Sequence, residues 1–394
     1  MIYDPYAREM QEDPYPAYRH FRDEEPCAYN PDMDFYALFR FEDVWQATLD
    51  WETYSSSLGP TLENRGEMPE GALSVIGMDP PRHVRIRNLA SKGFTPRRMA
   101  ALETEIREIA QRYLDPLRGA DGCDFQEAVA GKLPMDVISA LLGIPESERD
   151  AYRESIDKVL YRDPETGAMH PDVGIGMVGS RDFLVELLEK RRRDPADDVI
   201  SVLANTEYED IDGEKKKLTN QEAVAFAGLL AAAGFETTAK LLCNCIVYLA
   251  RAADQRAELW RDPSLMDGAI EEVLRYDAPS QYQGRVALRD AALHGVSIPK
   301  GARVALVTGA ACSDPREFDQ PEKLDIRRRS ERQIYFGHGH HVCIGKSLAR
   351  LETRIVLEEV RDRFPDYVVD EAGLTRTHQA HVRGFATVPM LFGA

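Results

Sequence analysis

The sequence lacks the features that mark several common classes of protein. Its 394 residues contain no Gly/Ser-rich or Pro-rich linker, no low-complexity tract and no internal repeat, so one domain over residues 1–394 is the simplest organisation. Positive charge is scarce, because 49 Lys and Arg face 67 Asp and Glu for a net charge of −18. A general nucleic-acid binder needs a basic surface, and we therefore expect no nucleic-acid partner.

No segment predicts export or membrane insertion. The N-terminal stretch MIYDPYAREMQEDPYPAYRHF has no apolar core, which a signal peptide or an anchor would need. The most apolar helix candidate, 221–253, has an uninterrupted apolar part of 13 residues, Ala223 to Phe235, whereas a membrane span needs about 20. We expect a cytoplasmic protein with no membrane partner, and we expect this helix to be buried in the core.

Cysteines are also few. Six in so long a chain do not make a disulfide framework, and reduced thiols are expected in the cytoplasm. Cys243 and Cys245 lie in the apolar helix candidate, where burial as small hydrophobic side chains is favoured over metal binding. Each remaining cysteine has to be judged by its own surroundings.

Periodic apolar residues indicate that helices dominate the chain. Spacings of three and four residues mark helices at 96–114, 133–142, 179–193 and 221–253. Strand-like patterns lie at 35–41, 284–308 and 365–392. The predicted fold class is mainly α with small peripheral β-sheets.

Polar residues interrupt the middle of the apolar helix candidate. Gly234, Glu236, Thr237 and Thr238 lie there, although Gly weakens a helix and an ionised Glu is costly to bury. One explanation is a satisfied buried Glu with a Thr hydroxyl bonded back to a carbonyl one turn earlier. The other is a helix locally opened at a reaction site, where an acid and an alcohol move protons.

Residues 336–345, FGHGHHVCIG, place three histidines and a cysteine within six positions. Four zinc ligands so close together do not easily surround one tetrahedral ion, and no second ligand pair appears elsewhere in the sequence. A histidine-rich surface loop with no ligand is the simplest alternative. Against that alternative, Cys343 comes just before an amphipathic helix at 347–360, whose N-terminal dipole would stabilise a thiolate.

The glycines of this loop point to a third possibility. Gly337, Gly339 and Gly345 remove side chains, so the backbone can pass close to a flat, bulky ligand. A glycine loop that presents one thiolate at a helix N-terminus is what a haem iron with a cysteine axial ligand needs.

A nucleotide-binding motif elsewhere in the chain lacks its context. GIGMVG at 174–179 satisfies G-x-G-x-x-G, and Asp197 and Asp198 follow at about the expected distance. No hydrophobic strand precedes the motif and no βαβ pattern surrounds it. We therefore do not expect a dinucleotide site.

FGHGHHVCIG resembles the haem-binding signature of the cytochrome P-450 family, Phe-x-x-Gly-x-His/Arg-x-Cys-x-Gly. The matching residues are Phe336, Gly339, His341, Cys343 and Gly345. Other segments along the chain are similar to further motifs of the family, in the family's order: 79–99, AGFET at 233–237, EEVLR at 271–275 and YQGRVAL at 282–288.

The resemblance implies the cytochrome P-450 fold, with haem b between the long central helix and the cysteine loop. Cys343 would be the iron ligand, and Glu236 and Thr237 would deliver protons. Glu272 and Arg275 would support the proximal side without a catalytic role. The propionates of the haem would be bound by His83, Arg87, Arg285 and His341.

The implied function is that of a soluble, bacterial-type monooxygenase that acts on a mostly apolar small molecule with dioxygen. We expect a monomer that receives two electrons from a ferredoxin and its reductase, with a basic patch near the cysteine loop as the docking site. The patch residues would be Arg327, Arg328, Arg329, Arg332, Lys346 and Arg350. A peroxide-dependent oxygenase and a non-catalytic haem binder or sensor are the alternatives.

The substrate pocket is assigned by the same resemblance. It would take residues from the loop at about 62–75, from the central helix, from SQYQ at 280–283 and from a strand turn near the C-terminus. The individual candidates are Leu229, Ala232, Ala233, Gln281, Gln283 and Phe385.

Overall fold

The computed structural model describes residues 1–62, 74–160, 170–379 and 381–393. These residues form two compact units. Unit 1 comprises Met1–Pro80, Arg251–Cys343 and Arg376–Gly384, and unit 2 comprises Pro81–Ala250, Ile344–Thr375 and Phe385–Ala394. Each unit is described by itself, and the single domain expected from the sequence stays a prediction.

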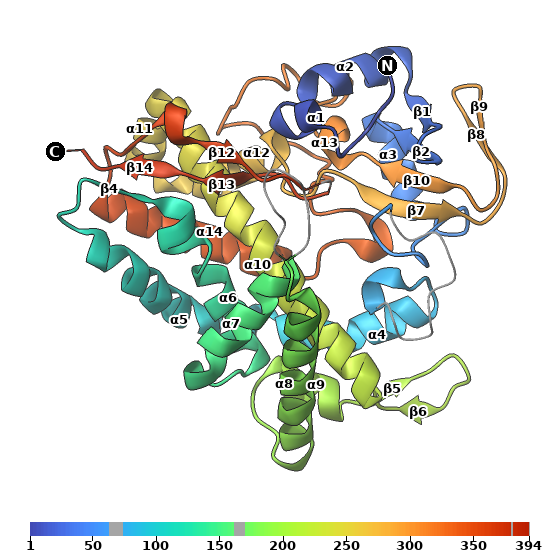
Figure 1. Ribbon diagram of the computed structural model, residues 1–394, viewed down its shortest axis with the longest axis horizontal. Helices are drawn as coiled ribbons and strands as arrows, with labels where there is room; N and C mark the ends of the chain where they lie inside the picture. Colours follow the sequence, from blue (N-terminus) through green and yellow to red (C-terminus); the bar gives the residue numbers. More distant parts are fainter. Residues whose placement is uncertain (63–73, 161–169, 380, 394) are drawn as a thin grey trace. The chain divides into compact units, whose positions relative to one another are not determined.

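Unit 1 is built on a five-stranded sheet in the order β1-β2-β10-β7-β3 (Figure 1). The strands are β1 (Cys27–Asn30), β2 (Phe35–Leu38), β10 (Arg303–Leu306), β7 (Gln283–Ala287) and β3 (Tyr54–Ser55). β2 and β10 are parallel, whereas β10 and β7 are antiparallel with Val304 opposite Arg285. This register places Arg285 in a buried part of the sheet, because every residue of β10 is buried.

Helices and a hairpin complete unit 1. They are α1 (Arg8–Glu12), α2 (Tyr15–Glu24), α3 (Phe41–Leu49), α11 (Ala253–Arg261), α12 (Met266–Tyr276), α13 (Thr308–Ala311) and the hairpin of β8 (Ala291–Leu293) with β9 (Val296–Ile298). Aromatic side chains fill the core beside α2. The ring of Phe39 stacks on Phe21 at 4.6 Å and meets Tyr3 edge-on at 5.0 Å, arrangements that aromatic pairs prefer.

Unit 2 is mainly helical. Its helices are α4 (Arg82–Ser91), α5 (Pro96–Leu114), α6 (Leu133–Leu142), α7 (Glu146–Leu160), α8 (Val173–Arg193), α9 (Val199–Asn205), α10 (Asn220–Arg251) and α14 (Lys346–Arg363). Its strands are β4 (Gly122–Asp124), β5 (Tyr208–Glu209), β6 (Lys215–Lys216), β11 (Val368–Val369), β13 (Phe385–Thr387) and β14 (Pro389–Leu391), and β12 (Thr375–Arg376) lies at the border of the units. The predicted fold class is confirmed.

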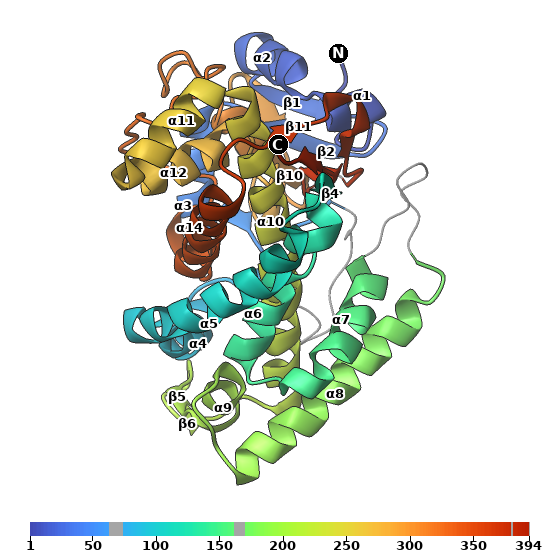
Figure 2. The same cartoon turned by 90° about the vertical axis from the view of Figure 1, so that its left-hand side faces the viewer.

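The helix α8 begins six residues earlier than the sequence pattern predicted. GIGMVG therefore lies inside a helix that packs side by side with α7 (Figure 2). A Cβ at Gly176 would lie 2.6 Å from the carbonyl oxygen of Ser155, so this glycine allows the close approach of the two helices. Helix packing therefore explains Gly176, whereas a Cβ at Gly174 would meet no neighbouring atom.

The helix α10 is the longest in the described parts of the chain. It is long and apolar enough to cross a membrane by length and composition, yet 61% of its most apolar window is buried within the protein. Core helices of globular proteins also have this composition. The helix runs without interruption from Asn220 to Arg251.

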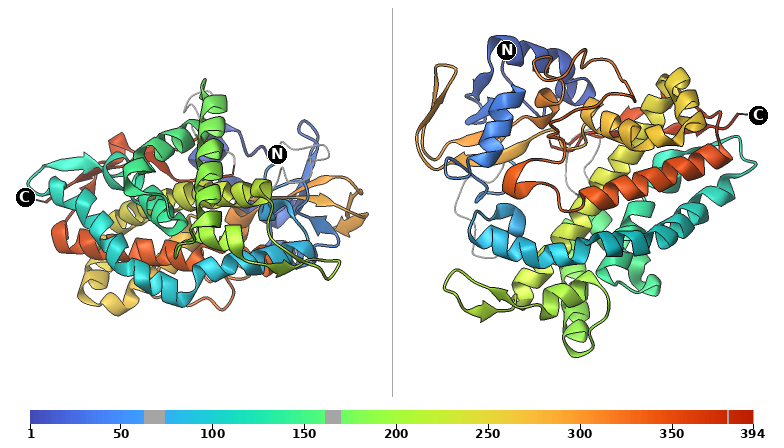
Figure 3. Two further views of the ribbon diagram at one scale, coloured as in Figure 1. Left: turned by 90° about the horizontal axis from the view of Figure 1, so that it is seen from below. Right: turned by 180° about the vertical axis from the view of Figure 1, so that it is seen from behind.

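The helices α5 and α14 run along each other and are joined by ion pairs (Figure 3). Arg107 contacts Glu358 at 2.6 Å and Glu359 at 2.7 Å, and Arg354 contacts Glu103 at 3.1 Å. The same helix α14 carries a different carboxyl, Glu352, which is 2% exposed and has an Oε2 atom with no hydrogen-bond partner among the described residues. Burial raises the pKa of Glu352 well above its ordinary value.

Glu352→Gln is expected to make the stability of the protein less dependent on pH. Since the pKa of Glu352 is raised in the folded state, its contribution is fully present below the unfolded pKa and is lost as the pH rises. The free energy of unfolding of the variant should therefore rise relative to that of the wild type as the pH increases, by about 1–2 kcal/mol near neutrality. Urea unfolding at several pH values measures this gain. Glu358→Gln, which removes a carboxylate with two arginine partners, should show no gain, and an equal loss in both variants would contradict the prediction.

Candidate functional site

The cysteine loop of unit 1 is a compact turn tied together by its own backbone. The amide of Cys343 donates to the carbonyl of Phe336 at 2.7 Å, and the amide of Gly337 donates to Ile334 at 2.7 Å. Gly337 and Gly339 have φ values of 72° and 66°, a region that favours glycine. A Cβ at Gly339 would also lie 2.9 Å from the carbonyl oxygen of Thr48. The two glycines are therefore required by backbone conformation and by close packing on α3.

Cys343 differs from the other cysteines in its exposure. All six are free thiols, and Cys343 is the exposed one. Burial raises the pKa of Cys27, Cys243 and Cys312 to about 12. It raises the pKa of Cys123 to about 11 and that of Cys245 still further. Because the thiolate is the form that binds metals, these five thiols are poor ligands at neutral pH, and Cys343 is the candidate.

The histidines of the loop do not form a metal cluster. In the described ranges of the chain, no group of three His, Cys, Asp or Glu side chains is arranged to hold a metal ion. His341 is partly buried in a short 3-10 turn, Gly339–His341, and His340 is exposed. The ring of His338 stacks on Trp45 of α3, with 3.6 Å between ring centroids. The structure thus gives His338 a partner that the sequence did not suggest.

Arg285 on β7 is a buried cation that uses only part of its guanidinium as a hydrogen-bond donor within the described residues. It is 6% exposed and donates to the carbonyl of its neighbour Gly284 at 2.7 Å. No carboxylate among the described residues pairs with it. Asp79 favours its charge from a distance, but the oxygens of Asp79 accept bonds from Ser55 and Ser56.

Burial lowers the pKa of Arg285 to about 10, so the side chain is still charged at neutral pH. A buried cation without an ion-pair partner is costly, and its remaining donors suit an anion. This donor set fits the carboxylate of a haem propionate.

In unit 2 the helix α10 carries the predicted acid and alcohol. The hydroxyl of Thr237 donates to the carbonyl of Ala233 at 2.7 Å, and Glu236 beside it is partly buried. This is the back-bonded threonine of the first explanation given above, in a helix that is not interrupted. Leu229 and Ala232 are partly buried, and Ala233 is exposed, so small side chains lie next to the pair.

The candidate propionate donors of unit 2 lie on α4. His83 is 1% exposed, and Arg87, which is partly buried, follows four residues later. Side chains at this spacing lie on the same face of a helix. The helix therefore presents an imidazole and a guanidinium together.

Phe385 at the start of β13 is held at both its backbone and its ring. Its carbonyl accepts a hydrogen bond from the buried Lys240 of α10 at 3.2 Å. Its ring, 2% exposed, lies 6.2 Å from that of Tyr248, two helical turns beyond Lys240. Lys240 is a residue that sequence reasoning missed, since a lysine in an apolar helix gives no sign of its acceptor.

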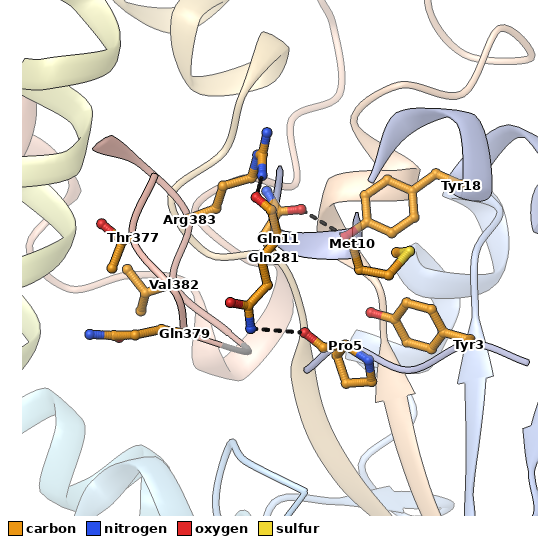
Figure 4. Close-up of a pocket in the computed structure, with 10 residues that line it drawn as sticks. All are labelled: Tyr3, Pro5, Met10, Gln11, Tyr18, Gln281, Thr377, Gln379, Val382 and Arg383. Atoms are coloured by element: carbon orange, nitrogen blue, oxygen red, sulfur yellow. Dashed lines mark hydrogen bonds between the residues drawn. The ribbon is translucent and has the colours of Figure 1, made fainter. Parts of the chain in front are cut away.

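Two glutamines assigned to the substrate pocket already have partners. Gln281 accepts from the hydroxyl of Tyr18 at 2.7 Å and donates to the carbonyl of Ala278 at 2.7 Å. It lines a pocket of unit 1 together with Tyr18 and Arg383 (Figure 4). Gln283 donates to Ser280 at 2.7 Å. Most of the assigned loop, residues 63–73, lies outside the described residues.

The buried ion pair of Glu272 and Arg275 on α12 is extended by a second arginine, Arg328. Two of the three guanidinium nitrogens of Arg275, Nε and Nη2, donate to the Glu272 carboxylate at 2.8 Å, and Arg328 donates to the same carboxylate at 3.1 Å. The amide of Asp325 also donates to it at 3.0 Å. Glu272 thus joins α12 to the segment that precedes the cysteine loop.

Three arginines of the predicted basic patch have acidic partners, and the docking patch itself stays a prediction. Arg328 is bound to Glu272, and Arg327 forms an ion pair with Glu258. Arg332 pairs with Glu42 at 2.7 Å and with Glu317. The run RRR at 327–329 does not reveal from sequence which of its members are paired, because the partners of Arg327 and Arg328 lie 69 and 56 residues away in the chain.

Comparisons with known proteins agree with these features. The family model described as Cytochrome P-450 matches residues 178–366. Putative cytochrome P-450 123 of Mycobacterium tuberculosis is 38% identical over 393 residues, which cover 99% of this chain and 96% of that protein. The vitamin D(3) 25-hydroxylase of Pseudonocardia autotrophica is 36% identical, with 99% and 96% covered. The solved structure of CYP109Q5 from Chondromyces apiculatus has a TM-score of 0.90 at 30% identity, over 100% of this chain and 98% of that one.

Proposed function

This chain belongs to the cytochrome P-450 family, and we propose that it hydroxylates or epoxidises a mostly apolar small molecule with dioxygen and electrons from a separate protein. The family binds the iron of protoporphyrin IX haem, and its members are monooxygenases. The observation that carries the proposal is the single exposed cysteine, Cys343, in a glycine loop closed by the Cys343–Phe336 hydrogen bond.

We assign the haem contacts by combining the family motifs with the donors described above. Cys343 would ligate the iron, and Phe336, Gly339 and Gly345 would shape the loop around it. The propionates would be bound by His83, Arg87, Arg285 and His341. The spare donors of the buried Arg285 support this assignment most directly.

When bound, the haem supplies the iron at which dioxygen is reduced, and one oxygen atom of dioxygen is transferred to the substrate. The role that we propose for the chain is to supply two protons. The Thr237 hydroxyl, which donates a hydrogen bond to the Ala233 carbonyl, would turn away from that carbonyl and donate its proton to the reaction. The Glu236 carboxyl would then restore that proton from solvent.

Thr237→Ala is expected to separate electron consumption from product formation. Without the hydroxyl, product formed per electron consumed should fall by at least about tenfold, a modest share of what a positioned acid contributes. NADPH oxidation and product are measured together, with a ferredoxin and its reductase and a ligand found by its spin-state shift. Thr238→Ala, at the buried neighbouring position, is the control and should stay coupled.

The alternatives give different results in the same experiment. Turnover with peroxide but none with ferredoxin would indicate a peroxide-dependent oxygenase. No product under either condition would indicate a haem binder or sensor. Equal coupling in the wild type and Thr237→Ala would remove Thr237 from the mechanism.

The substrate class and the cellular setting are further parts of the proposal. Ala232 and Ala233 leave space beside Thr237, and one relative is named for the hydroxylation of vitamin D(3), an apolar polycyclic molecule. We therefore favour a steroid-like, terpenoid or polyketide substrate over a charged one. We also propose a monomeric, cytoplasmic protein that uses a ferredoxin and its reductase.

A further inference from the structure

The exposure of α10 falls along the face that carries Thr237. Ala233, Thr237 and Lys240 follow one another at spacings of four and three residues, so they lie on one face of the helix. Ala233 is exposed, Thr237 is partly buried and Lys240 is 7% exposed. The open stretch of α10 beside Thr237 therefore ends at Lys240.

The strand β13 meets α10 at the point where this open stretch ends. The Nζ atom of Lys240 donates to the backbone carbonyl of Phe385 at 3.2 Å, and Phe385 is the first residue of β13. The ring of Phe385 is 2% exposed and lies 6.2 Å from the ring of Tyr248, which is further along the same helix. Both the backbone and the ring of Phe385 are thus in contact with α10. We call Lys240 and the backbone of Phe385 the end wall.

The other end of β13 is held by a different segment. The amide of Val388, just after the strand, donates to Oδ1 of Asp124 at 3.0 Å. The carbonyl of Val388 accepts from the amide of Phe125 at 2.8 Å. Loss of the Lys240 bond would therefore release the start of β13 from α10 while its end stays in place.

Stability does not explain a lysine in the end wall. A buried lysine amino group is costly, and within the described residues the Nζ atom of Lys240 has one hydrogen-bond partner, a carbonyl oxygen. An apolar side chain of similar length would fill the same space at no greater cost. Positions where a sequence breaks such a rule are often functional.

We propose that Lys240 is a positioning residue for the substrate. By holding the start of β13 against α10, it sets where the space over Ala233 and Thr237 ends, and so how bulky a ligand fits beside the iron. Because Lys240 is itself buried, it acts through the strand and does not touch the ligand. The inference rests on the proposed function and adds to it the selection of ligands by size.

The test compares two azoles of different size that bind haem iron. Imidazole needs little space beyond the iron, whereas 4-phenylimidazole adds a ring that extends away from it. Lys240→Met and Lys240→Leu remove the amino group and keep an apolar side chain. Cys245→Ala, at a fully buried residue of α10, is the matched control. Dissociation constants are measured from the shift of the Soret band, and urea unfolding is measured for each variant.

In both Lys240 variants the dissociation constant of 4-phenylimidazole should rise at least about fivefold, the scale of one lost hydrogen bond. The reason is that a strand free to move no longer offers a preformed contact to the added ring. The constant for imidazole should stay within about twofold of the wild-type value, because imidazole does not reach the end wall. Both variants should be at least as stable as the wild type in urea, and Cys245→Ala should keep both constants.

Three results would overturn the inference. These are a wild-type constant for 4-phenylimidazole in both Lys240 variants, equal weakening of both azoles, and the same selective loss in Cys245→Ala. Failure of the proposed function alone would look different, because the wild type would bind both azoles and yet form no product with ferredoxin. The ratio of the two constants would then still decide the inference. A wild type that binds neither azole would overturn both.

Discussion

Cys343→Ser is expected to abolish the red-shifted Soret band of the reduced carbon-monoxide complex and to reduce monooxygenase activity below detection. A serine hydroxyl stays protonated at neutral pH and cannot replace the electron-rich thiolate that favours O–O cleavage. The other five thiols cannot take over, because burial holds them in the protonated form. Absorbance spectra before and after reduction under carbon monoxide measure the effect.

The control is Cys123→Ser, at a partly buried thiol on β4. It should keep the band and the activity, since only the loop cysteine is assigned to iron. Circular dichroism of both variants shows whether they are folded. A folded Cys343→Ser protein that retains the red-shifted band would disprove the assignment of the ligand.

Glu272→Gln is expected to destabilise the protein by about 3–5 kcal/mol, the cost of breaking a buried ion pair by removing one partner. Its carboxylate is shared by Arg275 at 2.8 Å and Arg328 at 3.1 Å, and Arg275 is almost fully buried. A neutral amide would leave two guanidinium groups without an anion. The free energy of unfolding in urea measures the loss, and haem content should fall with it.

Glu322→Gln is the matched control, because Glu322 is exposed in the same part of unit 1. Exposed substitutions of this kind usually change stability by less than about 0.5 kcal/mol. A cost below about 1 kcal/mol for Glu272→Gln would show that Arg275 and Arg328 do not depend on its charge.

The spacing of apolar residues predicted the helices whose bounds depend on local sequence. The bounds of α5 and α6 agree with the periodicity of their apolar residues, and α10 differs by one or two residues at its ends. The start of α8 was missed because glycines weaken a helix. The packing of Gly176 on α7 cannot be read from the local pattern of either helix.

The candidate site was predictable where spacing is fixed by a motif, as in the loop that contains Cys343. It was not predictable where a side chain is bound by residues distant in the chain. Arg328 looked like part of a surface patch, yet it is bound to Glu272. The stack of His338 on Trp45 joins residues almost 300 positions apart. No local pattern encodes such pairs.

Four of the six cysteines are buried and a fifth, Cys123, is partly buried, which has a consequence for the durability of the protein. Oxygenases that lose coupling release peroxide, and peroxide attacks thiolates that solvent can reach. Solvent has little access to these five thiols, and their raised pKa values keep them protonated, which slows their conversion to sulfenic acid. Cys343 is thus the thiol most open to oxidation. In the haem-loaded enzyme its sulfur would be bound to iron, so the cofactor itself would cover the most easily oxidised thiol.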